Sequence, residues 1–338
     1  MCPKDQECKK TEQVETQKKV KKKNQFDWKQ REKEAIRFGI GYLCINMKSG
    51  FVNIIGRPNV GKSTLINALI GEKVSIVSKK VQTTRHRILG ILNGDGYQLV
   101  FSDTPGIIEN PKYLLHEVMM RYVSNALEDA DVVLYMVDVK DKMEDAASTL
   151  QKVIKTGKPV FLILNKIDLT EQDEAMELIK KWSAFIEPDK IIPISAVNAF
   201  NLEKIMQVAV EYLPEGEPFY PEEQYTDKSE RFLAAEVIRE KIFVHFKQEI
   251  PYSTTVVITE FKESEGLVRI SAEIIVSRES QKPILIGKGG ESLKRVGTLA
   301  RKELEETYGK KVFLELFVKV RDDWREKKGF LNQYGYEA

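Results

Sequence analysis

Residues 56–63, with the sequence GRPNVGKS, constrain the fold of this chain more than any other segment. They fit the phosphate-binding pattern G-x-x-x-x-G-K-[ST], which requires a strand before the loop and a helix after it. The apolar run at residues 51–55 can form that strand, and residues 64–70 can continue as the helix. Loop N–H groups and the positive end of the helix dipole then face a polyphosphate. A chance glycine-rich turn is the alternative, and both flanking segments argue against it.

Residues of this loop have distinct expected roles. Lys62 is expected to reach the outer phosphates, and the Ser63 hydroxyl is expected to ligate Mg²⁺. The nucleotide contacts predicted for the loop are Gly56, Arg57, Pro58, Asn59, Val60, Gly61, Lys62, Ser63 and Thr64.

A second motif indicates which base is bound. Residues 165–168 read Asn165-Lys166-Ile167-Asp168 and follow a buried-strand run at residues 159–164. A carboxylate such as Asp168 can accept two hydrogen bonds from guanine, whereas adenine lacks that donor pair and is rejected. Asn165 can bond the base edge or brace the phosphate loop, and the stem of Lys166 can cover the base face. Ser195 and Ala196 end another strand and can offer a backbone N–H to the guanine oxygen. The sequence therefore predicts GTP and GDP as ligands.

Groups that sense the third phosphate are expected between these two motifs. The segment Asp103-Thr104-Pro105-Gly106 follows a strand at residues 97–101, so Asp103 can hold Mg²⁺ through water and the Gly106 N–H can approach the γ-phosphate. Residues 81–87 are polar and basic and are predicted to form a mobile loop. One threonine of this loop, Thr84 rather than Thr83, is expected to close onto Mg²⁺.

With these motifs in place, the chain resembles the translation-factor-related GTPases, and specifically the Era family of ribosome-assembly GTPases. The match is carried by GRPNVGKST at residues 56–64, QTTRHRI at 82–88, DTPG at 103–106, NKID at 165–168 and ISA at 194–196. It extends from about Met47 to the C-terminus. The resemblance implies maturation of the small ribosomal subunit and binding to the 3′ end of its RNA.

The catalytic water has no evident partner in this sequence. Many GTPases place a glutamine just after D-x-x-G, but here that position is Ile107, which cannot bond a water. The resemblance implies that Asn59 ligates a K⁺ ion that bridges the phosphates, whereas a loop-stabilising role for Asn59 is the alternative. Slow hydrolysis that is faster in K⁺ than in Na⁺ is therefore expected. The residues predicted to serve catalysis are Asn59, Lys62, Thr84, Asp103 and Gly106.

The C-terminal part of the chain looks like a type II KH domain. A helix at residues 228–248, strands at 254–259 and 267–276, helices near 283–286 and at 291–308, and a strand at 312–318 follow in that order. A G-x-x-G loop between the last two helices lets a sugar-phosphate backbone approach. A simple helix-turn-helix loop is the alternative. The predicted RNA contacts are Ile286, Gly287, Lys288, Gly289, Gly290, Lys294 and Arg295.

The predicted fold is an α/β P-loop GTPase domain, with a mostly parallel sheet and helices on both faces, followed by an α+β type II KH domain. The expected boundaries are a GTPase domain at residues 47–213, a linker at 214–225, a KH domain at 226–328 and a C-terminal tail at 329–338. Residues 47–227 hold 20 basic and 26 acidic side chains, whereas residues 228–329 hold 21 and 17. The more basic second domain is the expected nucleic-acid surface.

Residues 1–46 carry 12 Lys and Arg against 7 Asp and Glu, which is typical of a solvated, disordered arm. We hypothesise that the natural start is Met47 and that the head is a misassigned extension. All three cysteines precede Met47, so a reducing, cytoplasmic setting fits and neither a disulfide nor a zinc site is supported. His86, His116 and His245 show no metal-ligand spacing and are expected to be loop and helix-surface residues.

These patterns predict a GTP-hydrolysing switch that binds single-stranded RNA and needs Mg²⁺, with K⁺ as a further cofactor. The expected partners are the small-subunit rRNA and the small ribosomal subunit. Peripheral contact with the inner membrane stays an open alternative, and no stable binding to DNA is expected. One alternative is a nucleotide-gated RNA-binding scaffold with negligible turnover. A tRNA-modifying GTPase is another, although its catalytic C-terminal cysteine has no counterpart after Cys44. A GTPase with two G domains would need a second phosphate loop.

Overall fold

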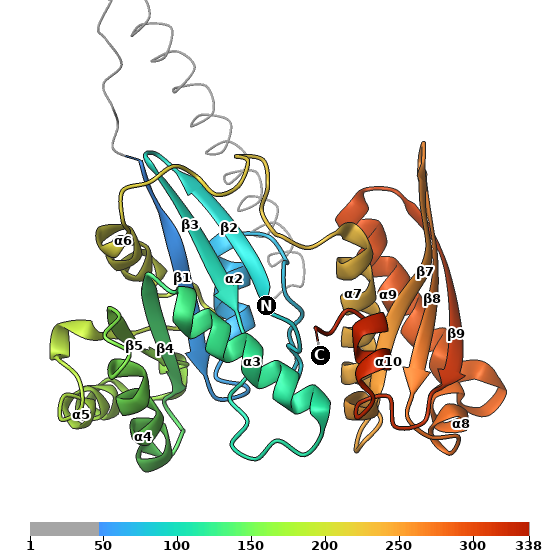
Figure 1. Ribbon diagram of the computed structural model, residues 1–338, viewed down its shortest axis with the longest axis horizontal. Coiled ribbons are helices and arrows are strands. Elements are labelled where there is room, and N and C mark those ends of the chain that lie inside the picture. Colours follow the sequence, from blue (N-terminus) through green and yellow to red (C-terminus); the bar gives the residue numbers. More distant parts are fainter. Residues whose placement is uncertain (1–46, 338) are drawn as a thin grey trace, which may run out of the picture. The chain divides into compact units, whose positions relative to one another are not determined.

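The computed structural model describes residues 47–337 of the chain. The predictions for residues 1–46, a basic arm and a natural start at Met47, lie outside the described residues. The chain from Met47 onward forms one compact unit, which contains two β-sheets (Figure 1). No helix of the described residues is long and apolar enough to cross a membrane.

The larger sheet has six strands in the order β2-β3-β1-β4-β5-β6. Only β2 and β3 pair antiparallel, and the other neighbours are parallel, which confirms the expected mostly parallel sheet. Its strands are β1 (Lys48–Gly56), β2 (Ile88–Gly94), β3 (Tyr97–Asp103), β4 (Val132–Asp138), β5 (Val160–Asn165) and β6 (Ile191–Pro193).

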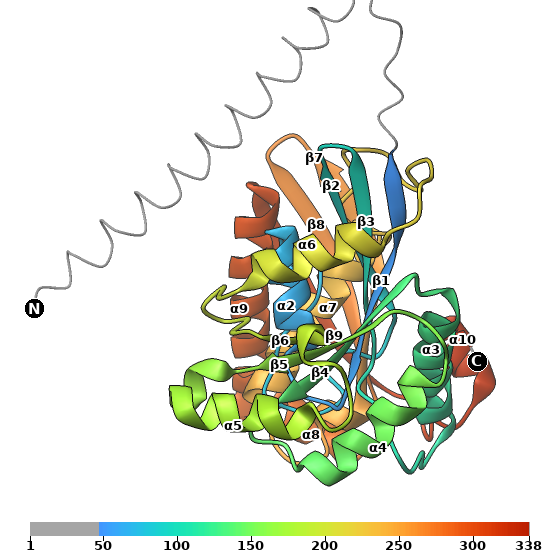
Figure 2. The same cartoon turned by 90° about the vertical axis from the view of Figure 1, so that its left-hand side faces the viewer.

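Helices cover both faces of this sheet. Successive side chains of a strand point to opposite faces, so β1 supplies apolar side chains to the core on each face. On β1, Val52 and Ile54 join the core under α2 and α6, whereas Ile55 joins the core under α3, α4 and α5 (Figure 2). The helices are α2 (Lys62–Ile70), α3 (Leu114–Asp129), α4 (Met143–Ile154), α5 (Gln172–Trp182) and α6 (Leu202–Tyr212). The carboxyl ends of β1, β3 and β5 therefore bring the phosphate loop, Asp103 and Asn165 to one edge of the sheet.

The smaller sheet has three strands in the order β7-β8-β9 and is covered on one face by α7 and α9. The pair β7–β8 is antiparallel and β8–β9 is parallel. The element order of a type II KH domain is confirmed, and α9 has the predicted bounds. The elements are α7 (Glu230–His245), β7 (Thr254–Ser264), β8 (Leu267–Val276), α8 (Gln281–Ile286), α9 (Glu291–Tyr308) and β9 (Lys311–Val320).

The C-terminal segment continues past β9 into a short helix, α10 (Lys328–Gln333), that sequence reasoning did not assign. Trp324, Leu331 and Tyr336 of this segment are buried in a cluster with residues of α3, including Leu115 and Met119. Apolar side chains of the predicted tail thus pack against the helix that follows the DTPG segment.

Candidate functional site

The phosphate loop ends at Gly61, whose φ of 105° puts it in the left-handed region before α2 begins. The first N–H groups of α2 have no acceptor within the helix, so they are available to bind an anion, as expected. A Cβ at Gly61 would lie 2.3 Å from the side-chain nitrogen of Asn165, which only glycine avoids. Lys62 Nζ donates to the carbonyls of Gly56, at 3.1 Å, and Arg57, at 2.9 Å. Burial lowers the pKa of Lys62 to about 8, and the Asp103 charge opposes that shift.

The DTPG segment lies directly against this loop. A Cβ at Gly106 would come 2.6 Å from the backbone nitrogen of Pro58, so glycine is required for that approach. The Ile107 N–H donates to the Gly56 carbonyl at 3.2 Å, and its side chain packs against the core under α3 to α5. Thr104 Oγ1 donates to the Ile54 carbonyl at 2.8 Å. The Ile107 side chain thus has no group for a catalytic water, and the Thr104 hydroxyl proton is used by the Ile54 carbonyl.

Three oxygen-bearing side chains converge beside Lys62, from the phosphate loop, the 81–87 loop and the end of β3. Ser63 Oγ lies 2.7 Å from Asp103 Oδ2 and 2.9 Å from Thr84 Oγ1. Thr84 Oγ1 donates to the same Asp103 oxygen at 3.3 Å. The Thr83 hydroxyl lies elsewhere, bonded to Ser78 Oγ at 2.6 Å and the Lys80 carbonyl at 2.7 Å. The structure thus brings Thr84, rather than Thr83, to the expected metal ligands.

This set fits Mg²⁺, which prefers hard oxygen ligands. The second carboxylate oxygen of Asp103 is buried with no hydrogen-bond partner. Burial raises the pKa of Asp103, while the hydrogen bond from Ser63 and the Lys62 charge oppose it. A divalent cation would compensate the buried charge that protein groups leave partly unpaired.

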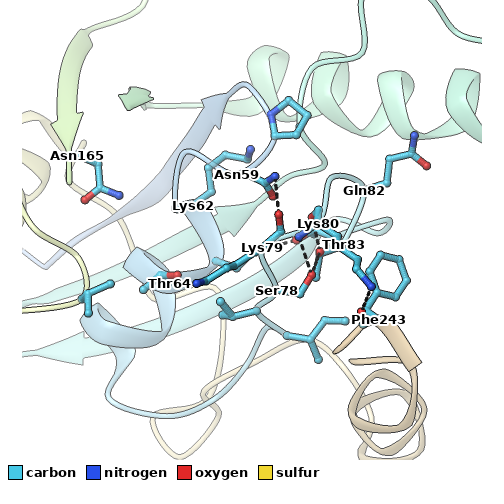
Figure 3. A pocket seen from close by; sticks show the side chains of 18 of the residues that line it. Asn59, Lys62, Thr64, Ser78, Lys79, Lys80, Gln82, Thr83, Asn165 and Phe243 are labelled. Atoms are coloured by element: carbon cyan, nitrogen blue, oxygen red, sulfur yellow. Dashed lines mark hydrogen bonds between the residues drawn. The ribbon is translucent and has the colours of Figure 1, made fainter. Parts of the chain in front are cut away.

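Asn59, the predicted K⁺ ligand, has a left-handed backbone with φ 65°. Its Nδ2 donates to the Lys79 carbonyl at 3.0 Å (Figure 3), so the amide does stabilise the loop. The amide oxygen remains as the one side-chain atom of Asn59 that can ligate a cation. Both alternatives weighed for this residue therefore stay compatible with the geometry.

The base motif is tied to the phosphate loop. Asn165 Nδ2 donates to the Val60 carbonyl at 2.7 Å, and its Oδ1 accepts from the Ala196 N–H at 3.0 Å. Of the two roles considered for Asn165, bracing of the loop is the one seen. The Ala196 N–H is used by that contact, whereas Ser195 Oγ accepts from Asn198 at 3.2 Å.

Lys166 and Asp168 occupy the outer part of the motif. Lys166 has a φ of 67° and donates to the Asn59 carbonyl at 2.9 Å, besides an ion pair with Asp138. The Lys166 side chain, predicted to cover a base face, is thus held by the phosphate loop and by the end of β4. Asp168 is exposed, and Ile167 beside it packs against the core under α3 to α5. Asn59 and Lys166 both have a positive φ, and strained backbone of this kind is typical of a ligand site.

The phosphate loop, Thr84 and the base motif line one pocket of about 900 Å³. Part of its wall comes from Phe243 and Val244 at the end of α7, which covers the smaller sheet (Figure 3). Lys80 Nζ donates to the carbonyls of Phe243 and Phe246. The 78–84 segment therefore lies between the phosphate loop and α7.

Sequence reasoning missed the role of Arg85, which it placed in a mobile polar loop. The side chain is fully buried. Nη1 donates to the Thr254 carbonyl at 2.7 Å, and Nη2 donates to those of Pro251 and Tyr252 at 2.9 and 3.1 Å. Its partners lie more than 160 residues away along the chain, so no local pattern could reveal them.

Arg239 of α7 was missed as well, although a signal existed. It stands in the apolar stripe of the helix, where an unpaired charge would be costly. Its Nε donates to Glu236 Oε1 at 2.7 Å, and its Nη2 donates to the Thr83 carbonyl at 2.5 Å. The expectation for His116 was wrong, because this side chain is 3 % exposed and buried in the packing of α3.

The predicted RNA loop is exposed between α8 and α9. Gly287, Gly289 and Gly290 have φ values of 75°, 60° and 83°, and Gly289 and Gly290 have open space where a Cβ would stand. Lys288 is exposed. Lys294 and Arg295 on α9 are exposed as well, and Ile286 is partly buried. The loop can thus admit a backbone, and basic side chains flank it.

Comparisons with known proteins match both parts of the chain. The family described as 50S ribosome-binding GTPase matches residues 51–166, and the family described as KH domain matches residues 249–325. A crystal structure of Era in complex with MgGDPNP and nucleotides 1506–1542 of 16S ribosomal RNA is 42% identical, with a TM-score of 0.82. That match covers 86% of this chain and 100% of the other. The chain belongs to the Era family.

A second Era structure agrees with this assignment. A variant of Aquifex aeolicus Era bound to GDP·AlF₄⁻ is 43% identical, with a TM-score of 0.82 and the same coverage of 86% and 100%. Because both matches span the GTPase and KH parts together, the resemblance to the Era family predicted from five motifs is confirmed, and so is the two-part fold. The KH match also decides against a bare helix-turn-helix loop.

Proposed function

We propose that this Era-family chain is a GTP-hydrolysing switch that binds the 3′ end of 16S ribosomal RNA and acts in maturation of the small ribosomal subunit. The observation that carries the proposal is the convergence of Ser63, Thr84 and Asp103 beside Lys62. Identity of 42% across the full length of an Era solved with MgGDPNP and 16S RNA supports the choice of ligands.

The nucleotide half of the proposal assigns each polar group a task. Lys62 and the first N–H groups of α2 bind the phosphates, and Asp168 accepts from guanine. Mg²⁺ held by Ser63, Thr84 and Asp103 would neutralise charge on the phosphates. Hydrolysis is expected to be slow, since Ile107 cannot orient a water. A K⁺ ion ligated by Asn59 is proposed to supply the charge that an arginine finger supplies in other GTPases.

The RNA half rests on the exposed G-x-x-G loop. Residues 287–290 would clamp the sugar-phosphate backbone, with Lys288, Lys294 and Arg295 near phosphates. Trp324 is excluded from this surface, because it is fully buried and its Nε1 donates to the Ser253 carbonyl at 2.9 Å. We propose a cytoplasmic site of action with the small subunit as partner, together with peripheral contact to the membrane.

GTP and GDP states must differ in RNA affinity for such a switch to work. The test is binding of a single-stranded copy of the 16S 3′ end, and of a scrambled RNA, with a non-hydrolysable GTP analogue or GDP in K⁺ buffer. Tighter binding of the true sequence in the GTP form is expected. Equal, weak binding to both RNAs in both states would remove the RNA half of the proposal.

Two glycine variants separate RNA contact from folding. Gly289→Asp puts a negative charge into the loop and should weaken RNA binding while GTP binding stays intact. Gly309→Asp is the matched control, because Gly309 has a similar φ of 63° and equally open surroundings at the other end of α9. A loss of GTP binding in Gly289→Asp would contradict the separation of the two sites. Measured GTP turnover distinguishes the switch from a scaffold without turnover.

A further inference from the structure

The C-terminal segment reaches the loop that carries Thr84. Tyr336 is 1 % exposed, and its ring stacks on that of His86 with centroids 4.3 Å apart and planes 15° from parallel. The Tyr336 N–H donates to the Leu331 carbonyl at 2.9 Å, and its hydroxyl lies 3.3 Å from Thr255 Oγ1. The backbone contact holds the segment in place, and the ring packs against His86.

His86 contacts aromatic rings from three separate elements. Besides Tyr336, it meets Phe232 of α7 edge-on at 5.1 Å and Tyr122 of α3 at 6.2 Å. Burial, with the cations Arg239, Lys228 and Arg85 nearby, lowers the pKa of His86 well below its usual value. The ring therefore packs as an aromatic group among three others.

The contacts of His86 restrain Thr84, which lies two positions earlier in the chain. Thr84 is followed by Arg85, whose guanidinium is bonded to two carbonyls just before β7 and to that of its first residue, Thr254, and then by His86. With Arg85 and His86 both fixed on its C-terminal side, the Thr84 hydroxyl lies 2.9 Å from Ser63 Oγ. Since each residue has only two soft backbone dihedrals, loss of the His86 anchor removes one of the restraints that aim Thr84, beside those on Thr83 and Arg85.

We propose that Tyr336 is a positioning residue of the GTPase site, which acts through His86 to hold the Thr84 hydroxyl beside Ser63 and Asp103. This inference rests on the proposed function. It assigns the C-terminal segment to nucleotide chemistry, although no residue after Ala196 belongs to the phosphate or base motifs.

The same segment offers a matched control. Tyr334 stacks on Phe330 at 6.0 Å and meets Trp324 edge-on at 5.9 Å. Its ring contacts are thus confined to the C-terminal segment, whereas those of Tyr336 include the 81–87 loop. Tyr334→Ala and Tyr336→Ala remove the same atoms within one turn of chain, so they separate general packing from contact with His86.

The experiment compares full-length wild type with Tyr336→Ala, Tyr336→Phe and Tyr334→Ala. GTP turnover is measured as a function of Mg²⁺, together with binding of a fluorescent non-hydrolysable GTP analogue and thermal unfolding. In Tyr336→Ala, the Mg²⁺ concentration for half-maximal turnover should rise by roughly two- to tenfold, the factor for an aromatic pair of about 0.5–1.5 kcal/mol. Tyr336→Phe keeps the ring and should retain the wild-type Mg²⁺ dependence, as should Tyr334→Ala.

An unchanged Mg²⁺ dependence in folded Tyr336→Ala would overturn the inference, and so would an equal rise in Tyr334→Ala. Should wild type bind the analogue but show no turnover, the hydrolytic function fails while the Mg²⁺ dependence of analogue binding still tests Tyr336. Should Tyr336→Ala unfold, Tyr336→Leu, which keeps an apolar side chain without the stacked ring, should show the same rise. Wild-type Mg²⁺ dependence in folded Tyr336→Leu would also overturn the inference.

Discussion

Arg239 and Glu236 form an ion pair on α7 that is almost fully withdrawn from water, with side chains 1% and 9% exposed. Arg239→Met removes the cation and leaves the Glu236 carboxylate buried. Loss of one partner of a buried pair costs about 3–5 kcal/mol. The Thr83 carbonyl also loses its donor, so the upper half of that range is expected for the free energy of unfolding.

The double variant Arg239→Met with Glu236→Leu should be less destabilised than the sum of the two single variants. It leaves neither charge of this pair buried, and of the groups that the pair contacts only the Thr83 carbonyl stays without a partner, at about 1–3 kcal/mol. The coupling energy should therefore reach about 3 kcal/mol. Lys181→Met is the control, because the pair of Lys181 with Glu177 is exposed, at 63% and 75%, and such pairs contribute at most about 1 kcal/mol.

Urea unfolding followed by tryptophan fluorescence suits this measurement, because Trp182 and Trp324 are both buried and report on α5 and on the C-terminal segment. The midpoint and the slope are compared for wild type, both single variants, the double variant and the control. A loss below about 1 kcal/mol in Arg239→Met, or additive single effects, would refute the reasoning from burial.

Three further predictions concern ligand choice, cation choice and pH. Asp168→Asn should shift preference from GTP toward xanthosine triphosphate by roughly 100-fold or more, measured by competition, because its amide no longer accepts both guanine donors. Asn59→Ala should remove the advantage of K⁺ over Na⁺ in turnover, whereas an unaltered advantage would exclude Asn59 as the ligand. Burial, Arg325, Arg85 and Lys112 lower the pKa of His116 to about 4, so wild type should lose about 2 kcal/mol of stability between pH 6.5 and pH 4.5, as the unfolded chain gains a proton that the folded one excludes. His116→Leu should lack this component of the pH dependence.

The phosphate and base motifs could be predicted because their chemistry is local. Gly61 must adopt a left-handed conformation before α2, and Asn165 must follow a buried strand, and both requirements can be read from neighbouring residues. Parallel strand order then brings these ends to one edge. The same locality explains why α9, whose apolar positions and flanking glycines are regular, has the predicted bounds.

Contacts between distant segments could not be predicted in this way. Arg85 looks like a solvated cation, because nothing near it in the sequence supplies the carbonyls that bury it. For α3 and α10 a local signal was present and unused: Leu115, Val118 and Met119 recur at helical spacing, and aromatic residues crowd residues 324–336. Which side chains these apolar faces contact still depends on the tertiary structure, since α3 and α10 cover one another's apolar side chains.

The loop at residues 83–86 has two sets of partners, and that division bears on how a switch can work. Thr84 meets Ser63 and Asp103 of the GTPase part, whereas its neighbours Thr83 and Arg85 are bonded to Arg239 and to the start of β7. A nucleotide that prefers one position of Thr84 must therefore also favour one set of contacts with the KH part. If GTP strengthens RNA binding by some factor through these contacts, RNA must strengthen GTP binding by the same factor, because the coupling free energy is shared. Tyr336 packs on His86, the next residue of this loop. By the same argument, a change at Tyr336 should alter the affinity for GTP and the affinity for RNA together.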